Sequence, residues 1–310
     1  DIFNSAGTFW NRIMGIAETP LCSVSIVTPG GKNIACHRSI AIVPDCALAD
    51  IDTADIIILG ALSDLANMTT KYRNVIRQLR QHYRKGALLA SICTGAFLRA
   101  ETGLLDGKVA TTHWGLAPLF RKKYPNVKLA PDRTVTEDGS ILCSGGANAG
   151  ADLALHLVRK FFGSETALNC ARVLLLDPQR SSQAPYRIAN VRTDHGDYEI
   201  AQVQKWVAAR FHKPITIENM ASKGAMSRRT FERRFRKATG ESPLRYLQIV
   251  RIESAKLLLE TKNNTFDEIT GMVGYEDTSS FRKIFQKTTG LSPSIYRKKF
   301  RHQGGSPQND

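Results

Sequence analysis

A cysteine and a histidine, the side chains needed for nucleophilic chemistry, each stand at the end of a strand-like run in this 310-residue chain. Cys93 follows the apolar run 87–92 and precedes a helix-like run that opens at Gly95. A nucleophile on such a strand-to-helix turn has the elbow arrangement, and the helix N-terminus is expected to lower the pKa of its thiol. His113 ends the run 109–112 and would bring an imidazole, the usual partner of a nucleophilic thiol.

Three interpretations of Cys93 are open: a pocket residue without turnover, an inert buried thiol, and a working nucleophile. We favour the first, with no catalytic residue and Cys93 with His113 as a vestigial nucleophile and its neighbour. His113 then serves as a hydrogen-bonding residue of a pocket or core. The residues expected to line a small-molecule pocket are Cys93, Thr94, His113, Trp114 and Asn148.

The six cysteines give no sign of a metal site. None belongs to a C-x-x-C pair, and none has the histidine spacing of a zinc site. We therefore expect reduced, mostly buried thiols, as in a cytoplasmic protein, and neither a metal nor a cofactor. No run of 18 apolar residues is present, so no membrane partner is expected.

The elements that must position Cys93 and His113 alternate between strand and helix patterns. The strand-like runs are 21–27, 56–60, 87–92, 109–112 and 141–143, and the helix-like runs are 2–15, 70–84, 95–101, 117–123, 150–162 and 165–175. Such alternation favours an α/β, flavodoxin-like domain with a mostly parallel sheet and helices on both faces. We assign residues 1–176 to this domain and expect its first strand to precede Asp1.

A second domain, without strand patterns, follows a linker. Residues 177–195 contain Pro178 and Pro185 and no sustained period, which is typical of a linker. Residues 196–302 are predicted to be all-α, and 303–310 a disordered tail. The helices are expected at 200–212, 217–223, 227–239, 243–261, 266–273, 278–289 and 293–300.

The positive charge is concentrated in this second domain. The whole chain has a formal net charge of +15, and residues 195–310 hold 21 Lys and Arg against 12 Asp and Glu. Residues 1–194 hold 22 against 16, so the net charge per residue is more than twice as high in the C-terminal part. A surplus of this kind favours a polyanionic partner.

An internal repeat with an offset of 50 residues explains what the second domain is. Phe231 matches Phe281, and the motif Thr-Gly-x-Ser-Pro recurs from Thr239 and from Thr289. Phenylalanines four residues apart point to one core, glycine ends a helix in a left-handed cap, and Ser-Pro starts the next. Glycines 224 and 274 fit the tight turn between two crossing helices, so the repeat predicts two helix-turn-helix units.

The second helix of each unit is expected to read double-stranded DNA in the major groove. Its outward positions carry arginine, lysine and serine, which suit base edges and phosphates. The predicted DNA-contacting residues are Arg228, Arg229, Glu232, Arg233 and Arg236 in the first unit and Thr278, Ser279, Arg282 and Lys283 in the second. The helix 243–261 joins the units and is about 28 Å long, which would place both reading helices about one DNA turn apart.

Residues 200–301 resemble the DNA-binding domain of AraC/XylS-type regulators. The signature runs from Gly274 through Ser280-Phe281 and Phe285 to Ser292-Pro293 and Tyr296. The resemblance implies a transcription regulator that responds to a signal.

The first domain resembles the class I glutamine amidotransferase-like domains of the PfpI-type branch, and the two halves together resemble the GlxA-type regulators. The motifs that carry this are Cys93-Thr94-Gly95-Ala96, Ala110-Thr111-Thr112-His113-Trp114 and the run from Ser144-Gly145-Gly146 to Leu153. Relatives of this domain include hydrolases in which the cysteine is catalytic. This chain departs from them at Gly60-Ala61-Leu62, where those enzymes often have a Gly-Gly pair, and their acidic partner of the cysteine would precede Asp1.

We therefore expect a cytoplasmic sensor and regulator, and not an enzyme. A small-molecule effector, such as an amino acid or a quaternary amine, would bind near Cys93 and alter how the basic helices meet DNA. The resemblance further implies a homodimer. The alternatives are a cysteine-dependent hydrolase or hydratase with a DNA-binding appendage, and a redox sensor that uses Cys93.

Overall fold

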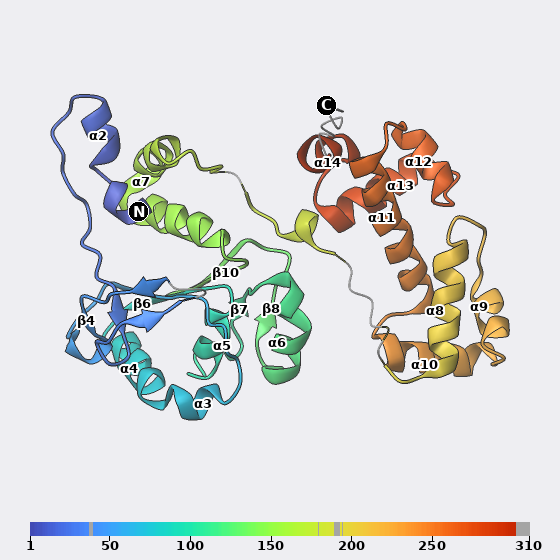
Figure 1. The fold of residues 1–310 in the computed structure, drawn as a ribbon, viewed down its shortest axis with the longest axis horizontal. Coiled ribbons are helices and arrows are strands. Elements are labelled where there is room, and N and C mark those ends of the chain that lie inside the picture. Colours follow the sequence, from blue (N-terminus) through green and yellow to red (C-terminus); the bar gives the residue numbers. More distant parts are fainter. Residues whose placement is uncertain (37–39, 179, 189–192, 194, 302–310) are drawn as a thin grey trace, which may run out of the picture. The chain divides into compact units, whose positions relative to one another are not determined.

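The computed structural model describes residues 1–36, 40–178, 180–188, 193 and 195–301, so the predicted tail 303–310 lies outside the described residues. The chain divides into two compact units, Asp1–Gln183 and Ala184–Asp310 (Figure 1). The division falls inside the segment 177–195 that the sequence indicated as a linker.

The N-terminal unit is built around a four-stranded sheet with the strand order β5-β6-β10-β9. The strands are β5 (Ile56–Leu59), β6 (Leu88–Ile92), β9 (Val135–Asp138) and β10 (Ile141–Ser144). β6 runs parallel to both β5 and β10, whereas β9 is antiparallel to β10. Three smaller pairs surround this sheet: β1 (Val27–Thr28) with β4 (Cys46–Ala47), β2 (Ile34–Ala35) with β3 (Ala41–Ile42), and β7 (Val109–Ala110) with β8 (Lys128–Leu129).

Helices cover both faces of the sheet, as the alternation of apolar runs predicted. They are α1 (Ile2–Ser5), α2 (Phe9–Ile13), α3 (Met68–Lys71), α4 (Arg73–Arg84), α5 (Gly95–Ala100), α6 (Ala117–Lys123) and α7 (Ala149–Val173). Leu89 and Ile141 point into a core shared with α4 and α5, and the alternate residues Ala90 and Leu142 pack with α7. Figure 1 shows α7 on one side of the sheet and α3 to α5 on the other. The α/β, flavodoxin-like fold class is thereby confirmed.

Glycines break two of the helices where the sequence patterns were less clear. The predicted helix 2–15 is two short helices, because Gly7 has a φ of 78° and a Cβ there would lie 2.0 Å from the carbonyl oxygen of Thr19. In α7, Gly163 has a φ of 89° and separates the two helices that were predicted on either side of it. The expected strand 21–27 was wrong over most of its length, since only Val27 is in a strand.

The C-terminal unit is helical and contains two similar cores. Its helices are α8 (Tyr198–Arg210), α9 (Ile217–Lys223), α10 (Arg228–Thr239), α11 (Pro243–Thr261), α12 (Phe266–Met272), α13 (Thr278–Thr289) and α14 (Pro293–Phe300). Phe231 and Phe235 are buried in the first core, and Phe281 and Phe285 in the second. α11 contributes residues to both, so the two helix-turn-helix units share one helix.

The caps of these helices follow the repeat closely. Gly240 and Gly290 end α10 and α13 in the left-handed conformation, with φ values of 82° and 75°. The turns before α10 and α13 differ: Gly274 has a φ of 83°, but in the first unit the positive φ of 53° falls on Ala225, one residue after Gly224. Gly274 cannot be replaced without strain, because a Cβ there would lie 2.8 Å from the carbonyl oxygen of His212.

All six cysteines are free. Only Cys143 and Cys170 are fully buried, so the expectation of mostly buried thiols was wrong for the other four, which are half-buried. Within the described ranges, no helix combines the length and the apolar character needed to cross a bilayer.

Candidate nucleic-acid interface and small-molecule site

The first unit presents a basic helix face that is anchored by its buried rings. Phe231 and Phe235 of α10 are fully buried, so the opposite face of the helix is directed to solvent. Arg229 and Arg233 are exposed, and Glu232 between them is half-buried. Ser227 caps the helix by accepting a hydrogen bond from the Thr230 N–H. The three outward residues therefore lie where the sequence placed them.

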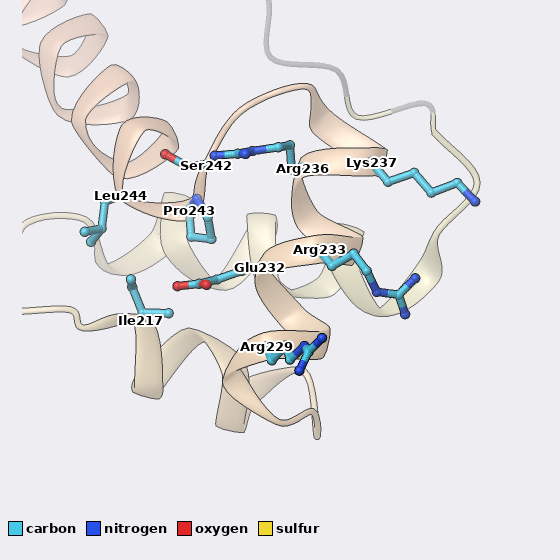
Figure 2. Close-up of a pocket in the computed structure, with 9 residues that line it drawn as sticks. All are labelled: Ile217, Arg229, Glu232, Arg233, Arg236, Lys237, Ser242, Pro243 and Leu244. Atoms are coloured by element: carbon cyan, nitrogen blue, oxygen red, sulfur yellow. The ribbon is translucent and has the colours of Figure 1, made fainter.

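A groove of about 640 Å³ runs along this helix. It is lined by Ile217, Arg229, Glu232, Arg233, Arg236, Lys237, Ser242, Pro243 and Leu244. Figure 2 shows Glu232 and Arg236 extending toward the start of α11, whereas Arg233 and Lys237 extend to the other side of α10. Four cations against one carboxylate make the groove electropositive, as a phosphate backbone requires.

Two other arginines of α10 are engaged within the protein. Arg234 lies 2.8 Å from both Asp197 and Glu199, and so fastens α10 to the start of α8. Arg228, which was predicted to contact DNA, pairs with Glu218 at 2.7 Å and with Glu232 at 3.2 Å. Among the described residues, no ion pair engages Arg229, Arg233, Arg236 or Lys237, so these are the cations of the helix most open to an anionic partner.

The second unit repeats the arrangement with less charge. Ser279, Arg282 and Lys283 of α13 are exposed, and Thr278 is half-buried. With the offset of 50 residues, Ser279 corresponds to Arg229, Arg282 to Glu232, Lys283 to Arg233 and Thr278 to Arg228. Phe281 and Phe285 of the same helix face the second core. The Arg282 guanidinium lies 5.3 Å from the centre of the Phe266 ring, a cation–π distance that orders its stem.

In the N-terminal unit, Cys93 sits on a tight turn at the carboxyl end of β6. Its φ of 55° is in the left-handed region, which is strained for a residue with a side chain. Its N–H donates to the Ser144 carbonyl (3.0 Å), and its carbonyl accepts from the Thr112 hydroxyl (2.9 Å). These bonds tie the ends of β6 and β10 to the segment after β7.

The expected lowering of the Cys93 pKa was wrong. Burial raises the pKa of this half-buried thiol, and the hydrogen bonds from Thr94 offset only part of the effect. The helix behind it, α5, has only six residues, so its terminal dipole is short. The neutral thiol is therefore the favoured form near neutral pH.

Thr94 is used to hold the loop after β5. Its hydroxyl donates to the Leu62 carbonyl (2.8 Å) and accepts from the Leu62 N–H (2.6 Å). Leu62 belongs to the segment where the amidotransferase-like enzymes often have their Gly-Gly pair. Its N–H is already satisfied by Thr94, and this removes one donor from any oxyanion site there.

The other predicted pocket residues lie near the same sheet edge. His113 Nδ1 accepts from the Gly115 N–H (3.1 Å), and its ring lies 5.2 Å from that of Trp114. Among the described contacts, no hydrogen bond joins Cys93 to His113. Asn148 is exposed, and its carbonyl accepts from the Arg180 guanidinium (2.6 Å) and from the Ala151 N–H (3.2 Å).

The structure adds one residue that the sequence analysis did not single out. Gln183 is buried, and its amide nitrogen lies 3.0–3.3 Å from four oxygens near the end of β7. It falls in the predicted linker, where no periodicity marks a buried position. Metal ligation finds no support in the described ranges, which contain no group of three or more histidine, cysteine or carboxylate side chains able to hold an ion.

Comparison with known proteins identifies both units. Residues 15–160 match the DJ-1/PfpI family, and residues 220–299 match a helix-turn-helix domain family. The chain thus combines a DJ-1/PfpI domain with a helix-turn-helix domain, and it is similar along most of its length to proteins named HTH-type transcriptional regulators.

Curated relatives share this two-domain organisation. The chain is 25% identical over 296 residues to the HTH-type transcriptional regulator GlxA of Rhizobium meliloti, covering 92% of this chain and 87% of that one. It is 24% identical over 265 residues to the HTH-type transcriptional regulator GbdR of Pseudomonas aeruginosa, covering 85% and 71%. A solved structure of the DNA-binding domain of AdpA, in complex with a target DNA, is 38% identical over 34% of this chain and 98% of that one, with a TM-score of 0.33.

Proposed function

We propose that this protein is a sequence-specific DNA-binding transcription regulator that senses a small metabolite through its DJ-1/PfpI domain. The observation that carries the proposal is the presence of two exposed basic helices, α10 and α13, on two matching cores joined by α11. Each core buries its phenylalanines and leaves the outward face of its second helix free for a ligand. A duplex offers two successive major-groove segments to such a pair.

The contacts we propose on DNA are those of the exposed cations and their equivalents in the second unit. Arg229, Arg233 and Arg236 are suited to guanine edges and phosphates, and Ser279, Arg282 and Lys283 to the next groove segment. We propose weaker DNA contacts for Glu232, Thr278 and Arg228, and the ion pair between Arg228 and Glu232 would hold these two side chains near the duplex.

The effector is proposed to bind at the carboxyl ends of β6, β7 and β10, where Cys93, Thr94, His113, Trp114 and Asn148 lie. This edge is the usual ligand site of α/β sheets. The neutral thiol and the satisfied Leu62 N–H support a binding role without turnover, as does the lack, among the described contacts, of a hydrogen bond between Cys93 and His113. The homodimer remains a prediction from the family resemblance, and the cytoplasmic location remains a prediction from the pattern of cysteines.

The test is selection of duplexes from a random pool by the full-length protein, followed by titration of a selected duplex at several salt concentrations. We expect the logarithm of the association constant to fall linearly with the logarithm of salt, with a slope set by the number of phosphates neutralised. Failure to enrich any sequence, or a binding constant that ignores salt, would contradict the proposal.

The positive φ of Cys93 favours one alternative, a cysteine-dependent hydrolase or hydratase, because strained turns of this kind present nucleophiles. The variant Cys93→Ala separates the two functions. Turnover of an amide, ester or nitrile substrate that disappears in this variant, while DNA affinity is unchanged, would establish the enzyme.

A further inference from the structure

The chain inserts one of its own side chains into a cluster of oxygen acceptors in the N-terminal unit. Gln183 Nε2 lies 3.0 Å from the carbonyls of Thr112 and Arg133, 3.1 Å from that of Pro131 and 3.3 Å from the Thr111 hydroxyl. We refer to these four oxygens as the acceptor cage. Within the cage, the Thr111 hydroxyl also donates to the Arg133 carbonyl (3.0 Å). An amide nitrogen has only two hydrogens, so the amide and this hydroxyl together supply three donated hydrogens to four oxygens.

The cage is adjacent to the proposed effector site. Thr112, whose carbonyl belongs to the cage, also donates its hydroxyl to the carbonyl of Cys93. Gly145 of the predicted glycine motif faces the amide so closely that a Cβ there would lie 2.2 Å from Gln183 Cδ. The next residue, Gly146, faces His113 in the same way, its Cβ position lying 3.2 Å from the ring. The two glycines thus make room for the amide and for the imidazole.

The backbone around Gln183 is bonded to the segment 132–134, and the Ser182 hydroxyl also donates to the Asp132 carbonyl (3.0 Å). The Gln183 N–H donates to the Asp132 carbonyl (2.8 Å), and the Ser181 carbonyl accepts from the Thr134 N–H (3.1 Å). Ser182 pairs with Arg133 as an isolated antiparallel bridge. Residues 181–183 therefore form a short strap that depends on the amide in the cage for its only buried side chain.

We propose that the acceptor cage is the binding site for a primary ammonium group of the effector, and that the Gln183 amide is a resident occupant which the effector displaces. An ammonium group brings three hydrogens and a positive charge to four oxygens, so it satisfies more of the cage than the amide does. This inference rests on the proposed function, because it assigns the chemistry of the same sensor site.

Displacement of the amide would be transmitted along the chain. Gln183 is the last residue of the N-terminal unit, and Ala184–Tyr186 packs within the DNA-binding unit, where the Tyr186 ring lies 5.3 Å from that of Phe300. No residue separates the strap from this second anchor. Release of residues 181–183 lengthens the free connection between the units, and this changes how the two reading helices are presented.

The experiment uses full-length Gln183→Ala with methylammonium chloride as the probe, and tetramethylammonium chloride, which has no N–H, at equal ionic strength. Without the probe, the emptied cage should lower the Tm of the N-terminal unit by about 2–10 °C. Methylammonium at tenfold over its Kd should raise that Tm by about 3–6 °C and slow hydrogen exchange in peptides containing residues 130–136. Tetramethylammonium should do neither, and Gln81→Ala, an exposed glutamine on α4, should behave like the wild type.

Gly145→Ala gives a second variant that keeps the glutamine. Its methyl group takes the place of the amide, so hydrogen exchange in residues 181–183 should become faster. The double variant Gln183→Ala with Gly145→Ala should show no rise in Tm with methylammonium. If methylammonium shifted the Tm of Gln183→Ala, of the double variant and of the wild type equally, the assignment of the acceptor cage as its binding site would be wrong. If methylammonium binds as expected but no variant changes the affinity for a selected duplex by threefold or more, the coupling fails and the site stands. If the wild type binds no duplex, the proposed function fails, whereas the thermal result still decides the cage.

Discussion

Arg234 on α10 contacts Asp197 at the N-terminus of α8, with Nη2 2.8 Å from Oδ1 and Nε 3.1 Å from Oδ2. The same carboxylate caps α8 by accepting from the Ile200 N–H. The Asp197 side chain therefore fixes both the start of α8 and the basic helix α10.

This carboxylate should make the first helix-turn-helix unit sensitive to acid. Burial raises the pKa of Asp197, but the bonds from Arg234 and Ile200 outweigh it and hold the pKa below its usual range. A depressed folded-state pKa contributes stability above the unfolded pKa, near 4, that is lost as the pH falls through the folded value. Asp197→Asn should lower the Tm at pH 7 and flatten its dependence on pH below 4, measured by circular dichroism. An unchanged pH profile would show that the pair is only a surface contact.

Replacement of a free cation on α10 should weaken DNA binding more than replacement of a paired one. Arg233→Ala should cost about 1–3 kcal/mol of binding free energy for a selected duplex if the side chain contacts a base. Arg228→Ala should cost less, because Glu218 and Glu232 already engage that guanidinium. Lys122→Ala, an exposed cation on α6, removes the same charge elsewhere and serves as the control. Equal losses for all three in fluorescence anisotropy would point to a general charge effect.

A glycine in a left-handed helix cap and a glycine inside a helix should respond in opposite ways to substitution by alanine. Gly290→Ala places a side chain at a φ of 75° and should destabilise the protein by about 1–2 kcal/mol. Gly271→Ala lies within α12, where the added Cβ meets no atom within 4 Å beyond its chain neighbours and the nearby backbone of its own helix, and it should stabilise the protein by about 0.5–1 kcal/mol. Urea denaturation measures both. A stabilising Gly290→Ala would mean that the repeat does not depend on its caps.

The raised pKa of Cys93 predicts a thiol that reacts slowly. At pH 7 the neutral form dominates, so alkylation by iodoacetamide should be slower than that of an unperturbed thiol, whose pKa is about 8.5. The rate should still be rising above pH 9, as followed by mass spectrometry of the peptide that contains Cys93. A rate that is already maximal below pH 7 would reveal a thiolate and favour the enzyme or redox alternatives.

The sequence was sufficient for the C-terminal unit because its signals are local. Helix periods, N-caps such as Ser227 and glycine stops such as Gly240 act within a few residues, and the repeat shows each of them twice. The bounds of α9, α11, α13 and α14 agree with the predicted ones residue for residue. Both domain families and the regulator class were also predicted from motifs.

The details of the proposed effector site depend on contacts between segments that are distant in the sequence. Residue spacing along the chain does not reveal such contacts. The pKa of Cys93 is set by burial and not by its place before a helix. Gln183 lies 72 residues from Thr111, in a stretch without apolar periodicity, so no pattern indicated that it is buried. Arg228 was predicted to contact DNA like Arg233, and only its ion pairs with Glu218 and Glu232 distinguish the two.

The helix shared by the two cores has a consequence for how the unit denatures. Tyr246 and Leu247 at one end of α11 belong to the first core, and Ile252, Ala255 and Leu259 further along it belong to the second. Unfolding of either core exposes apolar residues of α11 to water. Neither helix-turn-helix unit therefore keeps a complete hydrophobic core without the other. The two helix-turn-helix units should therefore unfold together in one cooperative transition, and a substitution that disrupts either core should abolish DNA binding by both.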